Sequence, residues 1–425
     1  MNQIFDRSLC RALNRTLTRT FSRLLVIGLA LFMAACSEQS KAPATAVDYQ
    51  KQLLEQLIMA KPGDVIDIPA GTHAINRSLS LKVNGVTLRG AGMDQSVLSF
   101  KNQTQGAEGI IITGDDILLE GFAVEDAKGD AIKINECRNL IIRKVRVEWT
   151  NGPDEGNGAY GLYPVQCENV LIDGSVAIGA SDAGIYVGQS NQVVVKNSRA
   201  EFNVAGIEIE NTTNADVFDN VATNNTGGIL VFNMPNLPQP GARTRVFNNQ
   251  ILNNNTANFA PEGTAVSGVP AGSGVVINSN DEVEVFANII KDNATANIII
   301  SSYFSSGYSD RAVSDLFDPY PEAIFIYDNQ FTGGGGSPDG VELQALRVAK
   351  YGLTGHFPDI LWDGYVNTDS LVNGKVPAGR EICVRNGDVK VLNVDMPNEY
   401  ANVTDESAQF DCELPKLAAI DLKLQ

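Results

Sequence analysis

Three neighbouring segments decide the fold: AGIYVGQ (183–189), AGIEIEN (205–211) and GGILVFN (227–233). The second residue of each is glycine, and consecutive copies lie 22 residues apart. Copies in the same frame occur at Gly109, Ala131, Gly161, Gly184, Gly206, Gly228 and Gly274. Apolar residues alternate with other residues in each copy, which is the pattern of a β-strand. A coil this short cannot bury its own apolar side chains and must stack on its neighbours. The repeat therefore predicts an all-β, single-stranded parallel β-helix.

A second strand in each repeat ends in asparagine. The segments VVVKN, DVFDN, RVFNN, EVFAN and FIYDN end at Asn197, Asn220, Asn249, Asn288 and Asn329. Asparagine tolerates the left-handed backbone of a turn, and asparagines stacked in successive coils can hydrogen-bond along the stack. A leucine-rich repeat would show its own leucine spacing with a helical leg, and a propeller would show repeats of about 40 residues. The sequence has neither pattern.

The sequence predicts a β-helix domain over residues 48–332. Its open strand edges need cover, and DYQKQLLEQLIMA (48–60) predicts an amphipathic N-terminal capping helix. The apolar side of that helix consists of Leu53, Leu54, Leu57 and Ile58. From about residue 333 the repeat fades. Residues 333–425 predict an irregular C-terminal cap or a small appended domain.

The first residues predict export. Five arginines precede an apolar run, LLVIGLALFMAA (24–35), that ends in small residues, as in a signal peptide over residues 1–35. The run is shorter than the roughly 20 residues of a transmembrane helix. Its end, MAAC, resembles a bacterial lipobox, which implies lipidation of Cys36, a tether over residues 36–47 and a place in the cell envelope. Ser37 after the cysteine implies the outer membrane. The alternative is an ordinary secretory signal with an incidental cysteine.

The charge balance limits the partners. The chain has 32 basic and 50 acidic residues, a formal net charge of −18. Such a surface repels nucleic acid and anionic lipid headgroups. We therefore expect membrane contact only through the N-terminal lipid anchor. A polysaccharide or another exported protein is the expected partner.

Cys10 lies in the signal peptide and Cys36 is expected to carry lipid, so four cysteines remain, an even number in an oxidising compartment. Cys137 and Cys167 each lie six residues after a repeat position, so they occupy the same place in consecutive coils. Adjacent strands are about 4.8 Å apart, which is within the Cα separation of a disulfide. A disulfide and a pair of stacked buried thiols both remain open. Cys383 and Cys412 form a second candidate pair in the C-terminal cap.

One outward position of successive coils carries the candidate chemistry. It is occupied by Lys133, Tyr163, Tyr186 and Glu208, with Glu210 two residues later and Asp130, Tyr160 and Asp182 just before. Because neighbours alternate between the two faces of a strand, these side chains are expected to face outward. Insertions at 148–159, 233–243 and 256–272 are expected to wall this face into a groove.

Tyrosines on such a face suit sugar rings, since they are apolar on the ring and hydrogen-bonding at the tip. The expected binding face is Tyr160, Tyr163, Tyr186 and Glu210. Lys133 and Glu208 are the candidate catalytic residues. A calcium site is an alternative use of the acids, with the candidate ligands Asp130, Asp182, Glu208 and Glu210. These residues could also be ordinary exposed charges.

The segment YGLYPVQ (160–166) is similar to a Tyr-Gly-x-Asp-Pro-His-Asp pattern of mannuronan C5-epimerases. Tyr160, Gly161 and Pro164 match it. Tyr163, Val165 and Gln166 replace its Asp, His and Asp. Removal of a sugar C5 proton needs acid and base groups, and Val165 supplies neither. The segment therefore argues against an epimerase of that type.

Over its mature length the chain resembles a family of bacterial surface lipoproteins with tandem parallel β-helix repeats and no assigned reaction. The resemblance to this pectate-lyase-like architecture, with the usual strand twist, implies a right-handed helix. The first functional hypothesis is a surface lipoprotein that displays a carbohydrate- or partner-binding face. The alternative is a polysaccharide (uronate) lyase or epimerase with a divergent, calcium-assisted site. A structural partner of another exported protein is a third hypothesis.

Overall fold

The computed structural model describes residues 48–307, 313–314, 317–405 and 407–424. Residues 48–425 form one unit by their contacts, separate from residues 1–47. The expected signal peptide, tether and lipidated Cys36 lie outside the described residues. Within the described part, no helix has the length and apolar character needed to span a membrane.

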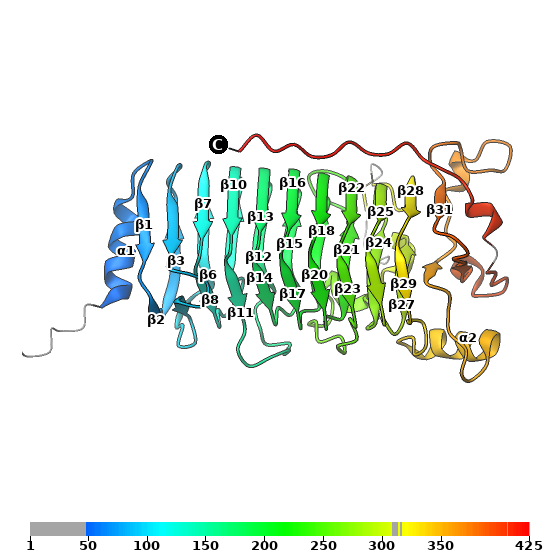
Figure 1. Ribbon diagram of the computed structural model, residues 1–425, viewed down its shortest axis with the longest axis horizontal. Coiled ribbons are helices and arrows are strands. Elements are labelled where there is room, and N and C mark those ends of the chain that lie inside the picture. Colours follow the sequence, from blue (N-terminus) through cyan, green and yellow to red (C-terminus); the bar gives the residue numbers. More distant parts are fainter. Residues whose placement is uncertain (1–47, 308–312, 315–316, 406, 425) are drawn as a thin grey trace, which may run out of the picture. The chain divides into compact units, whose positions relative to one another are not determined.

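The described chain winds through three parallel sheets (Figure 1). Sheet A contains β1 (Val65–Ile68), β4 (Thr87–Gly90), β7 (Ile117–Glu120), β10 (Arg138–Arg143), β13 (Glu168–Asp173), β16 (Asn191–Lys196), β19 (Thr213–Phe218), β22 (Ala242–Phe247), β25 (Asp281–Phe286), β28 (Ile324–Tyr327) and β31 (Ile382–Arg385). Sheet B contains β2 (Gly71–Ala74), β5 (Ser96–Ser99), β8 (Ala123–Glu125), β11 (Arg146–Glu148), β14 (Val176–Ile178), β17 (Arg199–Glu201), β20 (Val221–Thr223), β23 (Gln250–Leu252), β26 (Ile289–Lys291) and β29 (Gln330–Thr332). Sheet C contains β3 (Arg77–Leu81), β6 (Gln105–Thr113), β9 (Ile132–Asn135), β12 (Tyr160–Val165), β15 (Ala183–Gly188), β18 (Ala205–Glu210), β21 (Gly227–Phe232), β24 (Ser273–Asn278), β27 (Ala296–Ser301), β30 (Ile360–Trp362) and β32 (Val391–Asn393).

The register follows the repeat. Ile185 pairs with Ile207, which pairs with Ile229, which pairs with Val275. All four side chains point into the coil and are fully buried. The predicted parallel β-helix is therefore confirmed, with its core built from aligned aliphatic rows.

The repeat glycines are explained by close backbone approach. A Cβ on Gly206 would lie 2.5 Å from the carbonyl oxygen of Gly228 and 2.7 Å from Nδ2 of Asn225. Real Cβ atoms do not approach other atoms so closely, so the neighbouring coil and a buried asparagine leave no room for a side chain there. The 22-residue spacing of glycine is thus a packing requirement of the stack.

Two asparagine ladders run along the stack. In the first, each Nδ2 donates to the next Oδ1 at 2.9–3.2 Å through Asn220, Asn249, Asn288, Asn329 and Asn386. In the second, which the sequence analysis did not predict, the chain of bonds runs through Asn203, Asn225, Asn254, Asn293 and Asn297. In most steps, the backbone amide of the asparagine that donates through Nδ2 also donates to the same Oδ1 of the next asparagine. The ladders satisfy polar groups that would otherwise be buried without partners.

The inclusion of Asn197 in the first ladder was wrong. Asn197 aligns with Asp219, not with Asn220, and its exposed backbone has φ +52°. Ser198 occupies the ladder position, and its amide donates to Asn220 Oδ1 at 2.9 Å. The left-handed residue of each turn is the one before the ladder position.

Replacing Asn249 with alanine is expected to lower the free energy of unfolding by roughly 3 kcal/mol, because buried donors and acceptors on both neighbouring coils lose their partner. Its side chain accepts from the amide and Nδ2 of Asn220 and donates to Val217 O and Asn288 Oδ1. Urea unfolding measures the change. Asn151, exposed in a loop, is the control, and Asn151→Ala should change stability by less than about 0.5 kcal/mol. Equal effects of the two substitutions would contradict the structural role of the ladder.

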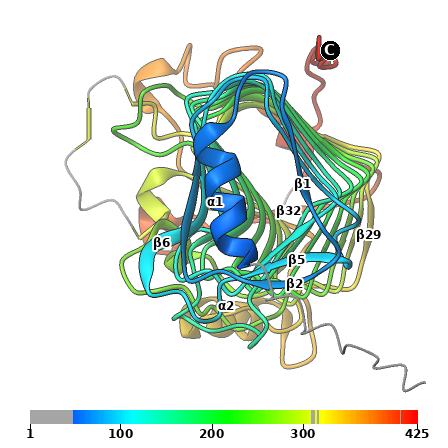
Figure 2. The same ribbon diagram turned by 90° about the vertical axis from the view of Figure 1, so that its left-hand side faces the viewer.

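Helix α1 (Tyr49–Met59) lies across the first coil, as the view along the stack shows (Figure 2). Leu53 and Leu57 are buried against the core, and Leu54 packs beside them. The N-terminal cap is therefore confirmed, but the placement of Ile58 on its buried side was wrong, since Ile58 is 75% exposed. Leu53 and Leu57 are one helical turn apart, and Ile58 is turned away from them.

The C-terminal segment continues the stack further than its sequence predicts. Strands β30, β31 and β32 extend sheets A and C, and helix α2 (Val341–Tyr351) packs outside them. A disulfide joins Cys383 to Cys412, with a Cα separation of 4.9 Å. Residues 333–425 thus belong to the same unit as the β-helix, as a cap does, rather than to an appended domain.

The last residues run back along sheet A as an extended strand-like tail (Figure 1). The amide of Ile420 donates to Asp216 Oδ2 at 3.1 Å, and Lys416 Nζ lies 4.7 Å from the ring centre of Tyr327. Lys423 and Leu424 reach the region of Thr87. Outward acids and aromatic rings of sheet A therefore hold the tail across most of the coils.

Candidate functional site

The structure brings the predicted site residues of sheet C together. In the pairing of β9, β12, β15 and β18, Lys133 lies beside Tyr163, Tyr163 beside Tyr186, and Tyr186 beside Glu208. Glu210 lies beside Gly188, two residues further along. We call the group the acid–tyrosine cluster: Asp130, Lys133, Tyr160, Tyr163, Asp182, Tyr186, Glu208 and Glu210.

Much of this face is covered, which corrects the expectation of an open strip. Tyr186 is 3% exposed and Glu208 is 1% exposed. Met234 and Val266, from two of the predicted insertions, pack in the same apolar cluster as Tyr186. The insertions therefore lie over the outward row instead of only flanking it. Tyr186 cannot serve as an exposed binding residue, and the cluster's acids are not ordinary surface charges.

The three tyrosines pack against one another at the uncovered side. The ring centre of Tyr160 is 4.3 Å from that of Tyr163 and 4.7 Å from that of Tyr186. Tyr163 and Tyr186 meet edge to face at 4.9 Å. Tyr160 and Tyr163 remain partly exposed, so they form the aromatic surface that a ligand could reach.

Lys133 lies at the outer edge of this surface. Its Nζ is 4.7 Å from the ring centre of Tyr163 and 3.5 Å from Asp130 Oδ2. Its side chain is 28% exposed. Burial raises the pKa of Asp130 although the Lys133 charge opposes this. The edge therefore offers one cation above an aromatic ring.

A hydrogen-bonded group links the tyrosines to Glu210. The Tyr186 hydroxyl donates to Glu210 Oε1 at 2.7 Å, and Gln189 Nε2 donates to the Tyr186 oxygen at 3.0 Å. Gln189 was not among the predicted site residues. It stands in the turn directly after Gly188 with φ +46°, and the only sequence signal for it is its place at the end of AGIYVGQ.

The buried carboxyl groups hold protons at unusually high pH. Burial, followed by the charge of Glu210, raises the pKa of Asp182 to about 7. Burial and the charge of Asp182 raise the pKa of Glu208 well above its usual range, and burial also raises the pKa of Glu210. The side chains of Tyr160 and Glu208 lie near Asp182 and affect its pKa, and Glu208 Oε2 is buried without a hydrogen-bond partner. Asp182 and Glu208 thus form a buried pair in which burial raises the pKa of both carboxyl groups and favours their protonated forms.

The tyrosine hydroxyls remain protonated in this environment. Burial and the charge of Asp130 raise the pKa of Tyr163 to about 12, and burial with the charge of Asp182 raises the pKa of Tyr160 well above its usual value. Both phenols can therefore donate hydrogen bonds at neutral pH. Tyr160 reaches from the partly exposed surface to the buried Asp182.

The candidate calcium ligands do not fit a calcium site. Calcium takes six to eight oxygen ligands, with ionised carboxylates among them, whereas Glu208 is held protonated and Asp130 faces Lys133. Among the described residues, no group of three or more His, Cys, Asp and Glu side chains has an arrangement that could hold a metal ion.

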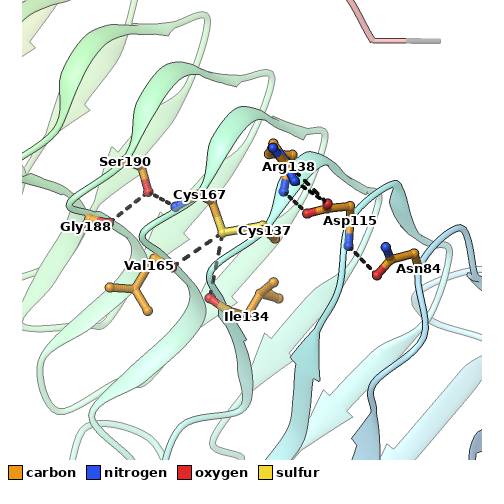
Figure 3. Close-up of a disulfide and its surroundings, with 9 residues drawn as sticks. All are labelled: Asn84, Asp115, Ile134, Cys137, Arg138, Val165, Cys167, Gly188 and Ser190. Atoms are coloured by element: carbon orange, nitrogen blue, oxygen red, sulfur yellow. Dashed lines mark hydrogen bonds and ion pairs between the residues drawn. A yellow bond between two sulfur atoms is a disulfide. The ribbon is translucent and has the colours of Figure 1, made fainter.

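A disulfide fixes the turn beside the site (Figure 3). Cys137 and Cys167 are joined across adjacent coils with a Cα separation of 4.5 Å, which resolves the choice left open by their sequence positions. The amide of Cys167 donates to Ser190 Oγ at 3.0 Å in the next coil. Val165, where the epimerase pattern has histidine, is the last residue of β12 just before this turn. The disulfide fixes the end of β12, the strand that carries Tyr160 and Tyr163.

Comparisons with known proteins found one family model and several solved structures. Residues 76–238 match the family model for a right-handed beta helix region. The A-module of the Azotobacter vinelandii mannuronan C-5 epimerase AlgE4 is 16% identical, covering 79% of this chain and 89% of its own, with a TM-score of 0.48. An alginate lyase from Paenibacillus sp. is 17% identical, covering 67% of this chain and 94% of its own, with a TM-score of 0.42. A DFA-IIIase from Arthrobacter chlorophenolicus is 10% identical, covering 71% and 83%, with a TM-score of 0.43. No curated protein matches the sequence. From its three parallel sheets and this family match, the chain is a right-handed parallel β-helix protein.

Proposed function

We propose that the protein binds a polysaccharide at Lys133, Tyr160 and Tyr163 and processes it by acid–base chemistry, as a uronate lyase or epimerase does. The observation that carries the proposal is the Asp182–Glu208 pair. Asp182 has a pKa of about 7 and lies under an accessible tyrosine surface. Strongly perturbed acids in such a place mark candidate catalytic sites.

The accessible edge suits a sugar ring. Tyr160 and Tyr163 offer aromatic surface with hydroxyl donors at the tips, and Lys133 offers a positive charge for a sugar carboxylate. Burial raises the pKa of Glu208 and Asp182 and favours their protonated forms, which reduces their repulsion of that carboxylate. The net negative charge of the chain therefore does not exclude a uronate substrate.

The proton transfers follow from the two kinds of group. Removal of a C5 proton needs a base whose pKa lies near the working pH, and departure of the leaving group needs an acid. Asp182 meets the first requirement: Tyr160 accepts the C5 proton as it passes its own hydroxyl proton to Asp182. The Tyr163 hydroxyl, whose pKa is raised to about 12, donates a proton to the leaving oxygen and regains one from water. Lys133 holds the sugar carboxylate.

The test is an assay of the mature protein on a panel of polyuronates and neutral polysaccharides, with binding measured by calorimetry. A lyase forms unsaturated uronate, which is detected by ultraviolet absorbance, and an epimerase changes the NMR spectrum of the polymer. Lys133→Ala should weaken binding of polyuronates, while Lys101→Ala, at an exposed position outside the cluster, should not. Binding without turnover would leave a carbohydrate-binding face as the function. If the protein shows no binding and no turnover of any polysaccharide in the panel, the proposal is refuted and an exported protein partner is favoured.

We also propose that the protein is anchored in the cell envelope by a lipid on Cys36. The two disulfides support an oxidising compartment. Cys36→Ser is expected to move the expressed protein from the membrane fraction to the soluble fraction and to abolish incorporation of labelled fatty acid. Unchanged labelling of the variant would contradict the anchor.

A further inference from the structure

A cavity of about 250 Å³ opens on the outer face of sheet C, beyond the acid–tyrosine cluster. Val276 of β24, Ile299 of β27 and Leu361 of β30 line it from adjacent coils, where they occupy one outward row. The insertion that contains Val269 and the cap segment that contains Met396 also line it. No residue of the acid–tyrosine cluster is among the described residues that line it, so the cavity is a separate site.

The lining is mainly apolar. Phe232, Met234, Val269, Leu343 and Met396 line it in addition to the aliphatic row. Water in an apolar cavity lacks hydrogen-bond partners, so an apolar occupant gains free energy by replacing it. Methionine side chains adapt to the shape of a ligand. The volume suits a body of about one aromatic ring.

Two residues of the lining, Asn278 and Trp362, have a buried side-chain polar atom without a hydrogen-bond partner, Oδ1 and Nε1 respectively. Asn278 is 3% exposed, and its Nδ2 donates to Ser301 Oγ at 2.9 Å and to Ser302 O at 3.0 Å. The backbone carbonyl of Ser302 can only accept, which fixes the orientation of the amide. Asn278 Oδ1 therefore remains an acceptor without a hydrogen bond in the protein. A buried acceptor of this kind favours a ligand that brings a donor.

The charged groups of the lining are all acidic. Asp339 and Glu342 are exposed, and Asp363 is buried. Among the described lining residues there is no lysine, arginine or histidine. Tyr400 and Phe232 add aromatic rings, which attract cations over their faces. The charge favours a cation and disfavours an anion.

We propose that this cavity binds a small hydrophobic amine. The apolar body packs against Val276, Ile299 and Leu361. The ammonium group donates a hydrogen bond to Asn278 Oδ1, and Asp363 and Glu342 supply negative charge in the lining. The proposal does not depend on polysaccharide chemistry, and its test contains no sugar.

The test compares three ligands of similar size by isothermal titration calorimetry: phenethylamine, 2-phenylethanol and 3-phenylpropionate. They share one aromatic ring and differ in being cationic, neutral and anionic. Phenethylamine should bind most tightly and 3-phenylpropionate at least about tenfold more weakly, which is about 1.4 kcal/mol. Equal binding of the cation and the anion, or no binding of phenethylamine, overturns the proposal.

Two variants locate the binding. Ile299→Trp should fill the cavity and abolish binding, whereas Ile111→Trp, on the same outward row of β6 at the other end of the stack, should leave it unchanged. Glu342→Gln, at an exposed helix position, should reduce the preference for the amine over the alcohol by several-fold without affecting folding. An unchanged preference in Glu342→Gln, or retained binding in a folded Ile299→Trp variant, also overturns the proposal.

Discussion

Replacing Asp182 with asparagine is expected to lower turnover of the polysaccharide by about 10²–10⁴-fold, the usual contribution of a general acid or base. Asparagine keeps the size of the side chain but cannot exchange a proton. Asp182 is only 6% exposed and acts through Tyr160, so binding of the polysaccharide should change much less than kcat. Steady-state kinetics of the variant, with KM and kcat determined separately, measure the effect.

Asp281 provides a matched control for that substitution. It is also a partly buried aspartate whose pKa is raised, to about 8, by burial and by the charge of Asp318. It begins β25 in sheet A and is not part of the acid–tyrosine cluster. Asp281→Asn should therefore retain full activity. Similar losses in both variants would show that Asp182 acts through stability alone.

The pH profile separates proton transfer from positioning. Asp182 acts as a base in its ionised form, and its pKa is about 7. Wild-type activity should therefore rise steeply as the pH increases through neutral. Tyr160→Phe keeps the aromatic ring beside Tyr163 but removes the hydroxyl that reaches Asp182. Tyr160→Phe should lower kcat, as Asp182→Asn does. A variant that keeps both its activity and the steep change near neutral pH would contradict the assigned relay.

The rows of the stack could be predicted from the sequence because register depends on repeat length. The spacing of 22 residues between Gly184 and Gly206 places Tyr186 beside Glu208, as the structure has it. Alternation also placed both side chains on the outside of the coil. It could not say whether another segment covers that outside. Met234 and Val266 cover this face. They belong to insertions that do not repeat, so their packing depends on their own apolar residues.

The phase of a ladder was harder to predict than its existence. VVVKN and DVFDN look alike, yet Val193 pairs with Ala215, so the asparagines of the two segments are one residue out of step. Ser198 occupies the ladder position, and its backbone amide donates the corresponding hydrogen bond to Asn220 Oδ1. The grouping of Asp182 with Glu208 was predicted, as candidate calcium ligands, but their burial, at 6% and 1% exposed, was not.

The stability of the protein is expected to fall as the pH rises from about 4 to about 7. An aspartate in the unfolded chain has a pKa near 3.9, whereas folded Asp182 has a pKa of about 7. Between these values the folded state holds a proton that the unfolded state has released. Stability then decreases with rising pH, because the native state binds more protons. The difference of about three pKa units corresponds to about 4 kcal/mol, lost in full above pH 7.

The measurement is chemical unfolding of the wild type and Asp182→Asn at a series of pH values from 4 to 8. Asparagine is uncharged throughout, so the variant should lose less stability across this window, and its advantage over the wild type should grow with pH. Asp281→Asn should relieve a separate loss that accumulates from about pH 4 to about pH 8, since burial raises the pKa of Asp281 to about 8. Parallel profiles for the wild type and Asp182→Asn would mean that Asp182 is ionised in the folded protein at neutral pH. The Asp182–Glu208 pair would then hold no exchangeable proton, and the acid–base role proposed for it would fall with that result.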